Sequence, residues 1–316
     1  MGAYFVRRVL QGVVVIFGVM LFVYVLERAV PGGAARAALG RRATAVQVAA
    51  FNHANDYDRP PWVGFYHYCK ALLLHFDLGY SYRENEPVAM LIGAVLPKTI
   101  VLVGLATLFS FVAAIVLGTI QVLRPNRPLD HLLTMLSFVS YATPSFLVAQ
   151  LLILYFAVDL HWVSTEAPQS TGVLGILSDP RDLVLPVVSL SIVIIASLVR
   201  FVRSSILDQL AHEYVRTARA KGASELRVVL RHVLRNAALP LVTIIGLSFP
   251  AVVGGAVIIE TVFNFPGMGL LTTQAATNED VPLLMGTTFV AALAAVVGSL
   301  VADLLYGIAD PRIRRA

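Results

Sequence analysis

Residues Ile100–Leu123 read IVLVGLATLFSFVAAIVLGTIQVL, a predominantly apolar segment without a charged side chain. A helix of about 20 such residues crosses the hydrocarbon core of a bilayer. The segment therefore predicts a membrane-spanning helix. The whole chain agrees, because 58% of its 316 residues are hydrophobic and only 14% are charged. Soluble domains carry about 25% charged residues, so the composition excludes an ordinary soluble protein.

Five further apolar segments have a comparable length: Val9–Leu26, Leu132–Val158, Leu183–Val199, Leu239–Ile259 and Val281–Ile308. Together with the first they predict an all-α polytopic membrane protein with six transmembrane helices. Pro144 and Pro186 are expected to kink the helices that contain them.

The first apolar segment has a second interpretation as a secretory signal peptide. Arg7 and Arg8 precede it, and Ala35-Arg36-Ala37 resembles a cleavage site with small residues. The run Val9–Leu26 is longer than the about 7–15 residues usual in a signal peptide, and charged residues separate it from that site. We therefore favour an uncleaved first helix.

Basic residues are concentrated in alternate short loops, which predicts the orientation of the spans because such loops stay cytoplasmic. The bases concerned are Arg124, Arg127, Arg200, Arg203, Arg216, Arg219, Lys221, Arg227, Arg231, Arg235, Arg312, Arg314 and Arg315. Both termini are then cytoplasmic, in a bacterial inner or plasma membrane. The net charge of +5 is explained by these loops, and we expect no nucleic-acid partner.

The predicted organisation has three parts. Residues 1–30 hold the first transmembrane helix, residues 31–97 an extracytoplasmic lobe, and residues 98–316 a five-helix core with a cytoplasmic loop at 213–236. We expect the lobe to be folded and partly helical, because it carries aromatic clusters and apolar pieces. Its single cysteine, Cys69, excludes an intramolecular disulfide, and the spacing of its histidines predicts no metal site.

The cytoplasmic loop Glu213–Asn236 reads EYVRTARAKGASELRVVLRHVLRN. Glu213–Lys221 is predicted to be a short helix that ends at Gly222, where a left-handed backbone suits glycine. Ser224 is in position to cap a second helix. In that helix an apolar stripe is predicted at Leu226, Val229, Leu230, Val233 and Leu234, and a separate basic stripe at Arg227, Arg231 and Arg235.

Two functions fit this pair of short helices. They can lie on the bilayer with arginines directed to lipid phosphates, or they can dock a cytoplasmic partner through the small residues Ala218, Ala220, Gly222 and Ala223. The pattern of residues alone leaves both open.

A resemblance to a known family favours docking. Arg216-Thr217-Ala218-Arg219-Ala220-Lys221-Gly222 resembles the EAA loop of ABC importer permeases, with Ala218 and Gly222 at the matching positions. Arg216 and Thr217 replace the first two residues of that pattern. EYVRTARAKGAS is similar to the dipeptide/oligopeptide permease branch, the DppB/OppB type.

Other segments along nearly the whole chain resemble the same branch in order and spacing. They are Asp77–Ser81, Pro87-Val88, Leu96–Thr99, Tyr141–Phe146, Leu185-Pro186, Glu260–Gly269 and Asp310–Arg314. Lys98 departs from the small residue expected between Pro97 and Thr99.

The resemblance implies a type I ABC importer permease fold that takes up short peptides. The implied partners are a second homologous permease subunit, one fused or two separate ATPase subunits, and an extracytoplasmic peptide-binding protein. Nickel, glutathione or haem are alternative substrates in this broad branch.

Candidate site residues follow from the loop and from the spans. ATPase coupling is expected to involve Glu213, Thr217, Ala218, Lys221, Gly222 and Ser224. The candidates for the translocation path are Tyr141, Pro144, Ser145, Glu260 and Phe263. Glu260 ends a predicted span, and an acid near membrane depth is a functional candidate; a hydrogen bond from an interfacial Glu260 to the adjacent broken backbone is its simpler explanation.

We expect no cofactor in this chain, and ATP and Mg²⁺ are used by partner subunits. Gly93–Thr99 approaches a phosphate-binding loop, but Pro97 stands where that loop needs glycine. Two rival functions find less support. An ion-driven secondary transporter predicts inverted repeats and ionisable residues at midplane, and neither is clear. An intramembrane enzyme lacks a catalytic constellation.

Overall fold

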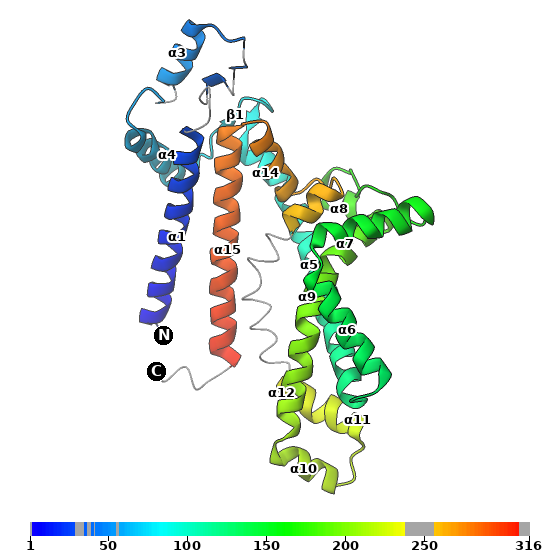
Figure 1. Ribbon diagram of the computed structural model, residues 1–316. Helices are drawn as coiled ribbons and strands as arrows, with labels where there is room; N and C mark the ends of the chain where they lie inside the picture. The colour runs from blue at the N-terminus through cyan, green and yellow to red at the C-terminus, as the bar shows by residue number, and fades with distance from the viewer. Residues whose placement is uncertain are drawn as a thin grey trace. The chain divides into compact units, whose positions relative to one another are not determined.

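The computed structural model describes residues 2–28, 35–36, 39–40, 42–54, 57–237 and 256–309. Within these ranges the chain is almost entirely helical (Figure 1). It forms two compact units, Met1–Thr99 with Pro266–Val296, and Ile100–Phe265 with Val297–Ala316.

The first unit contains the N-terminal helix α1 (Gly2–Arg28), the lobe, a helix that follows Pro266, and the last helix as far as Val296. The lobe consists of α3 (Ala45–Ala54), α4 (Pro61–His75) and a two-residue hairpin of β1 (Tyr80–Ser81) and β2 (Glu86–Pro87). The strands are antiparallel, with Tyr80 opposite Pro87. After them come α14 (Met268–Thr277) and α15 (Val281–Ala309). The described part of residues 31–97 is thus partly helical, as expected, and the lobe as a separate domain stays a prediction.

Two apolar clusters hold the first unit together. Phe65 of α4 packs with Met20 and Tyr24 of α1 and with Met285 of α15. The start of α5 (Val88–Leu123) packs through Val88 and Ile92 onto α14 and α15. A buried hydrogen bond from Ser81 Oγ to Asp280 Oδ2 ties the hairpin to the turn before α15.

The second unit is built around α9 (Pro180–Leu210), which packs against α5, α6 (Pro128–Ala142) and α7 (Ser145–Leu152). A π-helix, η1 (Ile153–Asp159), continues α7, and α8 (Gly172–Leu177) precedes α9. Beyond α9 lie α10 (Glu213–Ala220), α11 (Glu225–Arg227), the π-helix η2 (Val228–Val233) and α12 (Leu234–Ala237).

Among the residues that the structure describes, four helices are long and apolar enough to cross a membrane: Val6–Leu26, Val88–Leu123, Pro180–Leu210 and Val281–Val301. Each belongs to a helix that contains a predicted span, namely α1, α5, α9 and α15, so four of the six predictions are confirmed as single helices. The predicted span Leu239–Ile259 lies almost wholly outside the described residues. The count of six is therefore neither confirmed nor contradicted.

The remaining predicted span, Leu132–Val158, is not one helix. It is broken at Thr143 and Pro144, and its two halves, Pro128–Ala142 and Ser145–Asp159, are bent by 110°. Proline has no amide hydrogen and disfavours a helical conformation in the residue before it, and Thr143 accordingly has an extended backbone (φ −85°, ψ 129°). Pro186 lies inside the unbroken helix α9, so the two prolines have different consequences.

Candidate functional site

The loop after α9 contains the predicted coupling residues, and hydrogen bonds join its first helix to the end of α9. After Leu210 the chain turns through hydrogen bonds from the amides of Ala211 and His212 to the carbonyls of Asp208 and Gln209. α10 then begins at Glu213, and the Tyr214 hydroxyl donates to Gln209 Oε1 over 2.9 Å. The predicted helix is confirmed, and α9 fixes its first turn.

One face of α10 is packed against the chain's own core. Val215 and Ala218 are buried in a cluster that includes Val202 and Ile206 of α9 and Val229 of η2. Ala218 is only 8% exposed, so this small residue lets α10 approach its own supporting helices. It does not belong to the surface that α10 presents outward.

The other face of α10 is open. Exposed side chains on it are Glu213, Arg216, Thr217, Ala220 and Lys221. Arg216 pairs with Glu213 over 2.9 Å, and the Thr217 hydroxyl donates to the Glu213 carbonyl over 3.1 Å. α10 thus presents an outward surface of charged residues around two small ones, while its inner face holds it in place.

Gly222 ends α10 with the predicted left-handed backbone, at φ +82°. The amide of Gly222 donates to the Arg219 carbonyl (2.9 Å), and the amide of Ala223 donates to the Ala218 carbonyl (3.2 Å). These two bonds form a Schellman motif, which satisfies carbonyls at the end of the helix. An added Cβ at Gly222 would meet no atom within 4 Å, so the backbone conformation alone favours glycine there.

The turn after α10 is bridged by an ion pair. Arg219 Nε and Nη2 donate to Glu225 Oε1 and Oε2 over 2.8 and 3.0 Å. The hydrogen bond that Arg219 donates to the Glu225 carboxylate raises the pKa of the Arg219 guanidinium, so the arginine stays charged. Both side chains are exposed, and the pair contributes to the geometry of the turn more than to stability.

Ser224 occupies the cap position of the next helix, with an extended backbone (φ −66°, ψ 152°). Its carbonyl accepts from the Val228 amide over 2.9 Å, but its side chain makes no capping hydrogen bond. The prediction of the cap's position is confirmed, and the expected contribution of its hydroxyl is absent.

The predicted apolar stripe in that helix is partly wrong. Val229 and Val233 are buried as expected, but Leu226 and Leu230 are 53% and 50% exposed, and Val228 is fully buried instead. The reason is η2, whose i→i+5 hydrogen bonds turn the backbone more slowly than an α-helix does. Val228 and Val233 therefore fall on the same side. The basic stripe Arg227, Arg231 and Arg235 is exposed throughout.

The broken span places two of the path candidates at an exposed position. Tyr141 is 57% exposed near the end of α6, and Pro144 is exposed at the N-cap of α7. Ser145 is half-buried. The guanidinium of Arg200 lies 4.5 Å from the centre of the Tyr141 ring and 5.3 Å from that of Phe138. A cation–π contact thus connects α9 to the last turn of α6.

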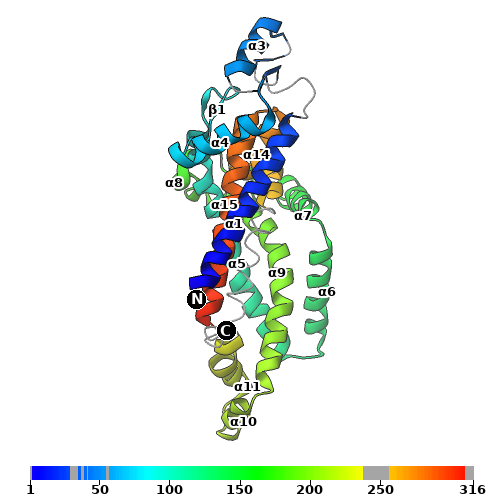
Figure 2. The same ribbon diagram turned by 90° about the vertical axis from the view of Figure 1, so that its left-hand side faces the viewer.

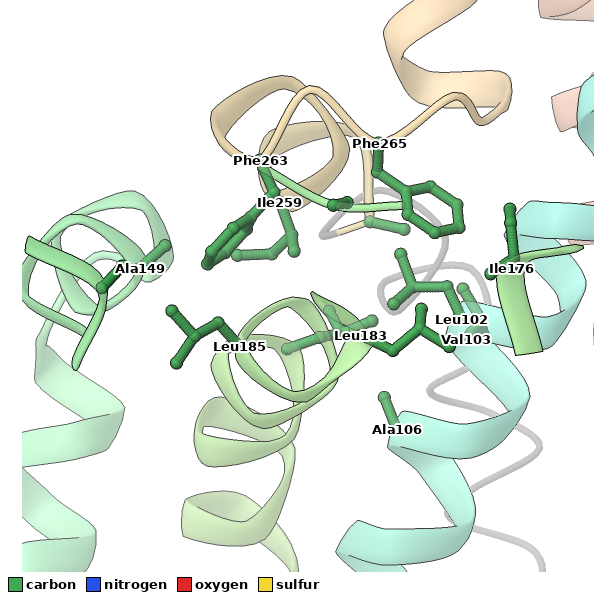
Figure 3. Close-up of a cluster of buried hydrophobic side chains, with 14 residues drawn as sticks. Leu102, Val103, Ala106, Ala149, Ile176, Leu183, Leu185, Ile259, Phe263 and Phe265 are labelled. Atoms are coloured by element: carbon green, nitrogen blue, oxygen red, sulfur yellow. The ribbon is translucent and has the colours of Figure 1, made fainter. Parts of the chain in front are cut away.

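The other two path candidates are inside the protein. Phe263 and Glu260 have fully buried side chains, and Figure 3 shows Phe263 and Ile259 lying over Leu185 in an apolar cluster. The helix 256–262 is followed by a turn at Phe263 and Asn264, and Asn264 has a positive φ of 49°.

Hydrogen bonds within the backbone, and from a neighbouring loop, hold the turn that follows this helix. The Phe265 amide donates to the Glu260 carbonyl over 2.8 Å, and the Ala167 amide donates to the Phe263 carbonyl over 2.9 Å. Gln169 Nε2 adds hydrogen bonds to the carbonyls of Ala167 and Asn264. This part of the site is a rigid turn packed into the core of the second unit.

One polar pair was missed by the sequence analysis. Asp130, only 3% exposed, accepts a hydrogen bond from Arg203 Nη2 over 3.2 Å and one from the Asn126 amide over 3.1 Å. The pair ties the first turn of α6 to α9. The available signal was an acidic residue just after the turn Arg127-Pro128, where a helix begins.

Comparison with known proteins identifies the family. Residues 110–315 match the family model "Binding-protein-dependent transport system inner membrane component", and residues 1–103 match the model of its N-terminal region. These models cover more than half of the chain.

Three relatives match over nearly their full length. The chain is 35% identical to the oligopeptide transport system permease protein AppB of Bacillus subtilis, with 99% of each chain covered. It is 36% identical to a putative peptide permease protein of Brucella suis, and 32% identical to the glutathione transport system permease protein GsiC of Escherichia coli, with 98% of each chain covered in both cases.

A solved structure shares the fold. It is described as inward-facing conformations of the MetNI methionine ABC transporter, and its similarity has a TM-score of 0.52 at 16% identity, covering 67% of this chain and 93% of that one. Proteins of this family are multi-pass permease subunits of ABC importers in the inner membrane. They work with a partner permease, a substrate-binding protein and an ATPase, which hydrolyses the ATP. On the evidence of the family models and the full-length relatives, the chain belongs to the binding-protein-dependent transport system inner membrane component family.

Proposed function

We propose that this chain forms one half of the translocation pore of an importer for short peptides, and that α10 is the element through which the ATPase drives it. The observation that carries the proposal is that α10 is packed against the chain on one face and exposed on the other. Its inner face is packed on α9 and η2 through Val215 and Ala218, while Glu213, Thr217 and Lys221 are exposed. A helix held on one side and open on the other can transmit the movement of a docked partner.

The mechanism is alternating access by movement of rigid bodies. ATP binding closes the ATPase pair, which draws α10 of this chain and the corresponding helix of a homologous second permease together and opens the pore outward. Hydrolysis resets it. The ATPases are one fused or two separate subunits, and ATP and Mg²⁺ bind to them alone. Both termini of this chain face the cytoplasm, and a peptide-binding protein delivers substrate on the other side.

Each coupling residue has a distinct role in this proposal. Glu213, Thr217 and Lys221 contact the ATPase, and Ala218 holds α10 on its base. Gly222 permits the turn, and Ser224 starts the helix that supports it. Among the path candidates, Tyr141, Pro144 and Ser145 are placed at the break of a span, where backbone and side chain can line a pathway. We assign Glu260 and Phe263 to the support of the turn that follows the helix 256–262, because both side chains are buried.

Short peptides are the substrate class that the names of the relatives favour, since AppB is an oligopeptide permease and the Brucella suis relative a putative peptide permease. The glutathione permease GsiC is a relative of similar extent, and glutathione is itself a tripeptide. Nickel and haem remain alternatives with no support from these names. Uptake of labelled di-, tri- and pentapeptides into vesicles that hold the complex, with glutathione as competitor, identifies the substrate.

Site-specific cross-linking tests the docking of α10. In a Cys69→Ala background, Thr217→Cys or Ala220→Cys is labelled with a benzophenone maleimide, and the complex is illuminated. We expect an adduct with the ATPase from both positions. Ala218→Cys is the matched control, one residue away from Thr217 but buried, and it is expected to give none. Adducts with lipid instead of the ATPase at positions 217 and 220 would support the alternative in which α10 lies on the membrane.

A further inference from the structure

Helix α4, which the sequence places in an aqueous lobe, has an apolar face that no described residue covers. Trp62, Tyr66 and Leu73 recur at four- and seven-residue spacing, so they lie on one side of the helix. They are 72%, 62% and 73% exposed. Leu74 and Phe76, at the end of the helix, are also exposed, at 62% and 84%. Soluble proteins rarely expose such a continuous apolar surface unless a partner or a membrane covers it.

The contacts of α4 show where this apolar surface lies relative to the membrane-spanning helix α1. Phe65 packs against Phe17 and Tyr24 of α1, with ring centres 5.3 Å apart in both pairs. Phe17 and Tyr24 belong to the apolar stretch Val6–Leu26 that is long enough to cross a membrane. At about 1.5 Å per residue, Tyr24 and Phe17 lie about 3 Å and about 14 Å along the helix from Leu26. α4 is therefore beside the membrane-spanning part of α1, not beyond its end.

The boundary of the membrane is marked nearby. Arg28, just past the apolar stretch, donates to the Tyr24 hydroxyl over 2.8 Å and to the Arg59 carbonyl over 3.0 Å. Its guanidinium lies over the rings of Tyr24 and Tyr57 at 5.2 and 5.5 Å. Tyrosine and arginine at the end of an apolar helix are typical of the lipid headgroup region. α4 begins two residues after Arg59 and lies near the upper end of α1 in both views (Figures 1 and 2).

We propose that α4 is an interfacial helix, lying in the plane of the membrane with Trp62, Tyr66 and Leu73 inserted among the acyl chains. Helices of this kind bury their apolar face about 5–10 Å below the headgroups, which is the depth at which Phe65 meets α1. The occupant of the exposed face is lipid. Lys70, exposed beside this face, reaches the phosphate level. The helix sets the height of the extracytoplasmic lobe above the bilayer and resists vertical movement of α1.

Spin labelling tests this in the intact complex reconstituted into vesicles of phosphatidylethanolamine and phosphatidylglycerol. Cysteines other than the labelled one are replaced, and a nitroxide is attached to Trp62→Cys, Tyr66→Cys or Leu73→Cys. Collision rates with oxygen, which partitions into lipid, and with a water-soluble nickel chelate give the depth. We expect severalfold more collisions with oxygen than with nickel at all three positions. Val46→Cys, on the exposed part of α3, is the matched control and should show the opposite ratio.

Two results would overturn the proposal. Frequent collisions with nickel at positions 62, 66 and 73 would place α4 in water. Low collision rates with both reagents would show that a protein subunit covers the face. Normal assembly and peptide uptake of each labelled variant establish that α4 keeps its place, and where one of the three fails to assemble, the other two decide.

Discussion

Arg219 and Glu225 face each other across the turn at Gly222 and make two parallel hydrogen bonds of 2.8 and 3.0 Å. The pair joins the end of α10 to the start of α11, so the direction of α10 depends on it as well as on the packing of Val215. Its exposure limits its energy to the about 0.2–1 kcal/mol of surface ion pairs. Its effect is therefore expected on coupling, not on folding.

We expect Arg219→Glu to lower the ATPase stimulation caused by loaded binding protein about two- to fivefold, a change equivalent to the energy of one exposed ion pair. The melting temperature should hardly change. The swap Arg219→Glu with Glu225→Arg should restore stimulation, because the pair is rebuilt in reverse. Failure of the swap, with both single variants impaired, would mean that these side chains act on the ATPase directly.

Gly222→Val should impair transport strongly, because a β-branched residue at φ +82° costs more than the about 1–2 kcal/mol of an ordinary side chain in that region. Gly222→Asn is the matched control, since asparagine tolerates the left-handed region and the space around Gly222 is open. Uptake and binding-protein-stimulated ATP turnover are measured after gel filtration of the complex. Wild-type turnover in Gly222→Val would exclude this turn as the coupling element.

Two glycines on α5 should respond to alanine in opposite ways. A Cβ at Gly118 would come within 2.7 Å of Val202 Cγ1 and 3.3 Å of the Arg203 amide nitrogen of α9, whereas a Cβ at Gly104 would meet nothing within 4 Å. Gly118→Ala is expected to destabilise by about 1–3 kcal/mol through overpacking. Gly104→Ala should be neutral or gain up to about 1 kcal/mol from helix propensity. Thermal unfolding in detergent compares the two, and adding Val202→Ala should relieve part of the loss at Gly118.

Labelling of Cys69 should depend steeply on pH. Burial raises the pKa of its thiol, and the thiolate is the reactive form. At neutral pH labelling is therefore slow, and its rate should rise about tenfold per pH unit until the raised pKa is reached. Lys70→Cys in a Cys69→Ala background is the exposed control and should react faster. An impermeant maleimide applied to intact inner membranes should reach the cysteine of Lys70→Cys, and reaction only after the membrane is opened would reverse the predicted orientation.

The membrane spans could be predicted because crossing a bilayer requires only a sufficiently long apolar segment, and both length and composition are read directly from the sequence. The break at Pro144 could be predicted only as a kink. The 110° bend between the two halves depends on how α6 and α7 pack against Arg200 and the rest of α9. Other proline-containing helices, such as α9 at Pro186, continue without a break. Local sequence does not distinguish these two outcomes.

In the coupling loop, too, some features could be predicted from local sequence and others could not. α10 and the turn at Gly222 follow from local signals, namely helix spacing and a glycine at the helix end. The burial of Ala218 and Val228 does not, because it depends on which residues of α9 lie opposite. A strict α-helical period places Leu226 and Leu230 inward, and the π-helix turns both outward.

The π-helix η2 also bears on how the family can vary in length. A π-helical turn accommodates one more residue than the α-helical turn it replaces, and the segments before and after it keep their places. Removal of one residue between Val228 and Val233 would convert η2 to ordinary α-helix and leave Glu225 and Ala237 in register. A single-residue deletion, which would disrupt most packed helices, is thus tolerable at this point of the chain, and homologues one residue shorter here can keep the same α10.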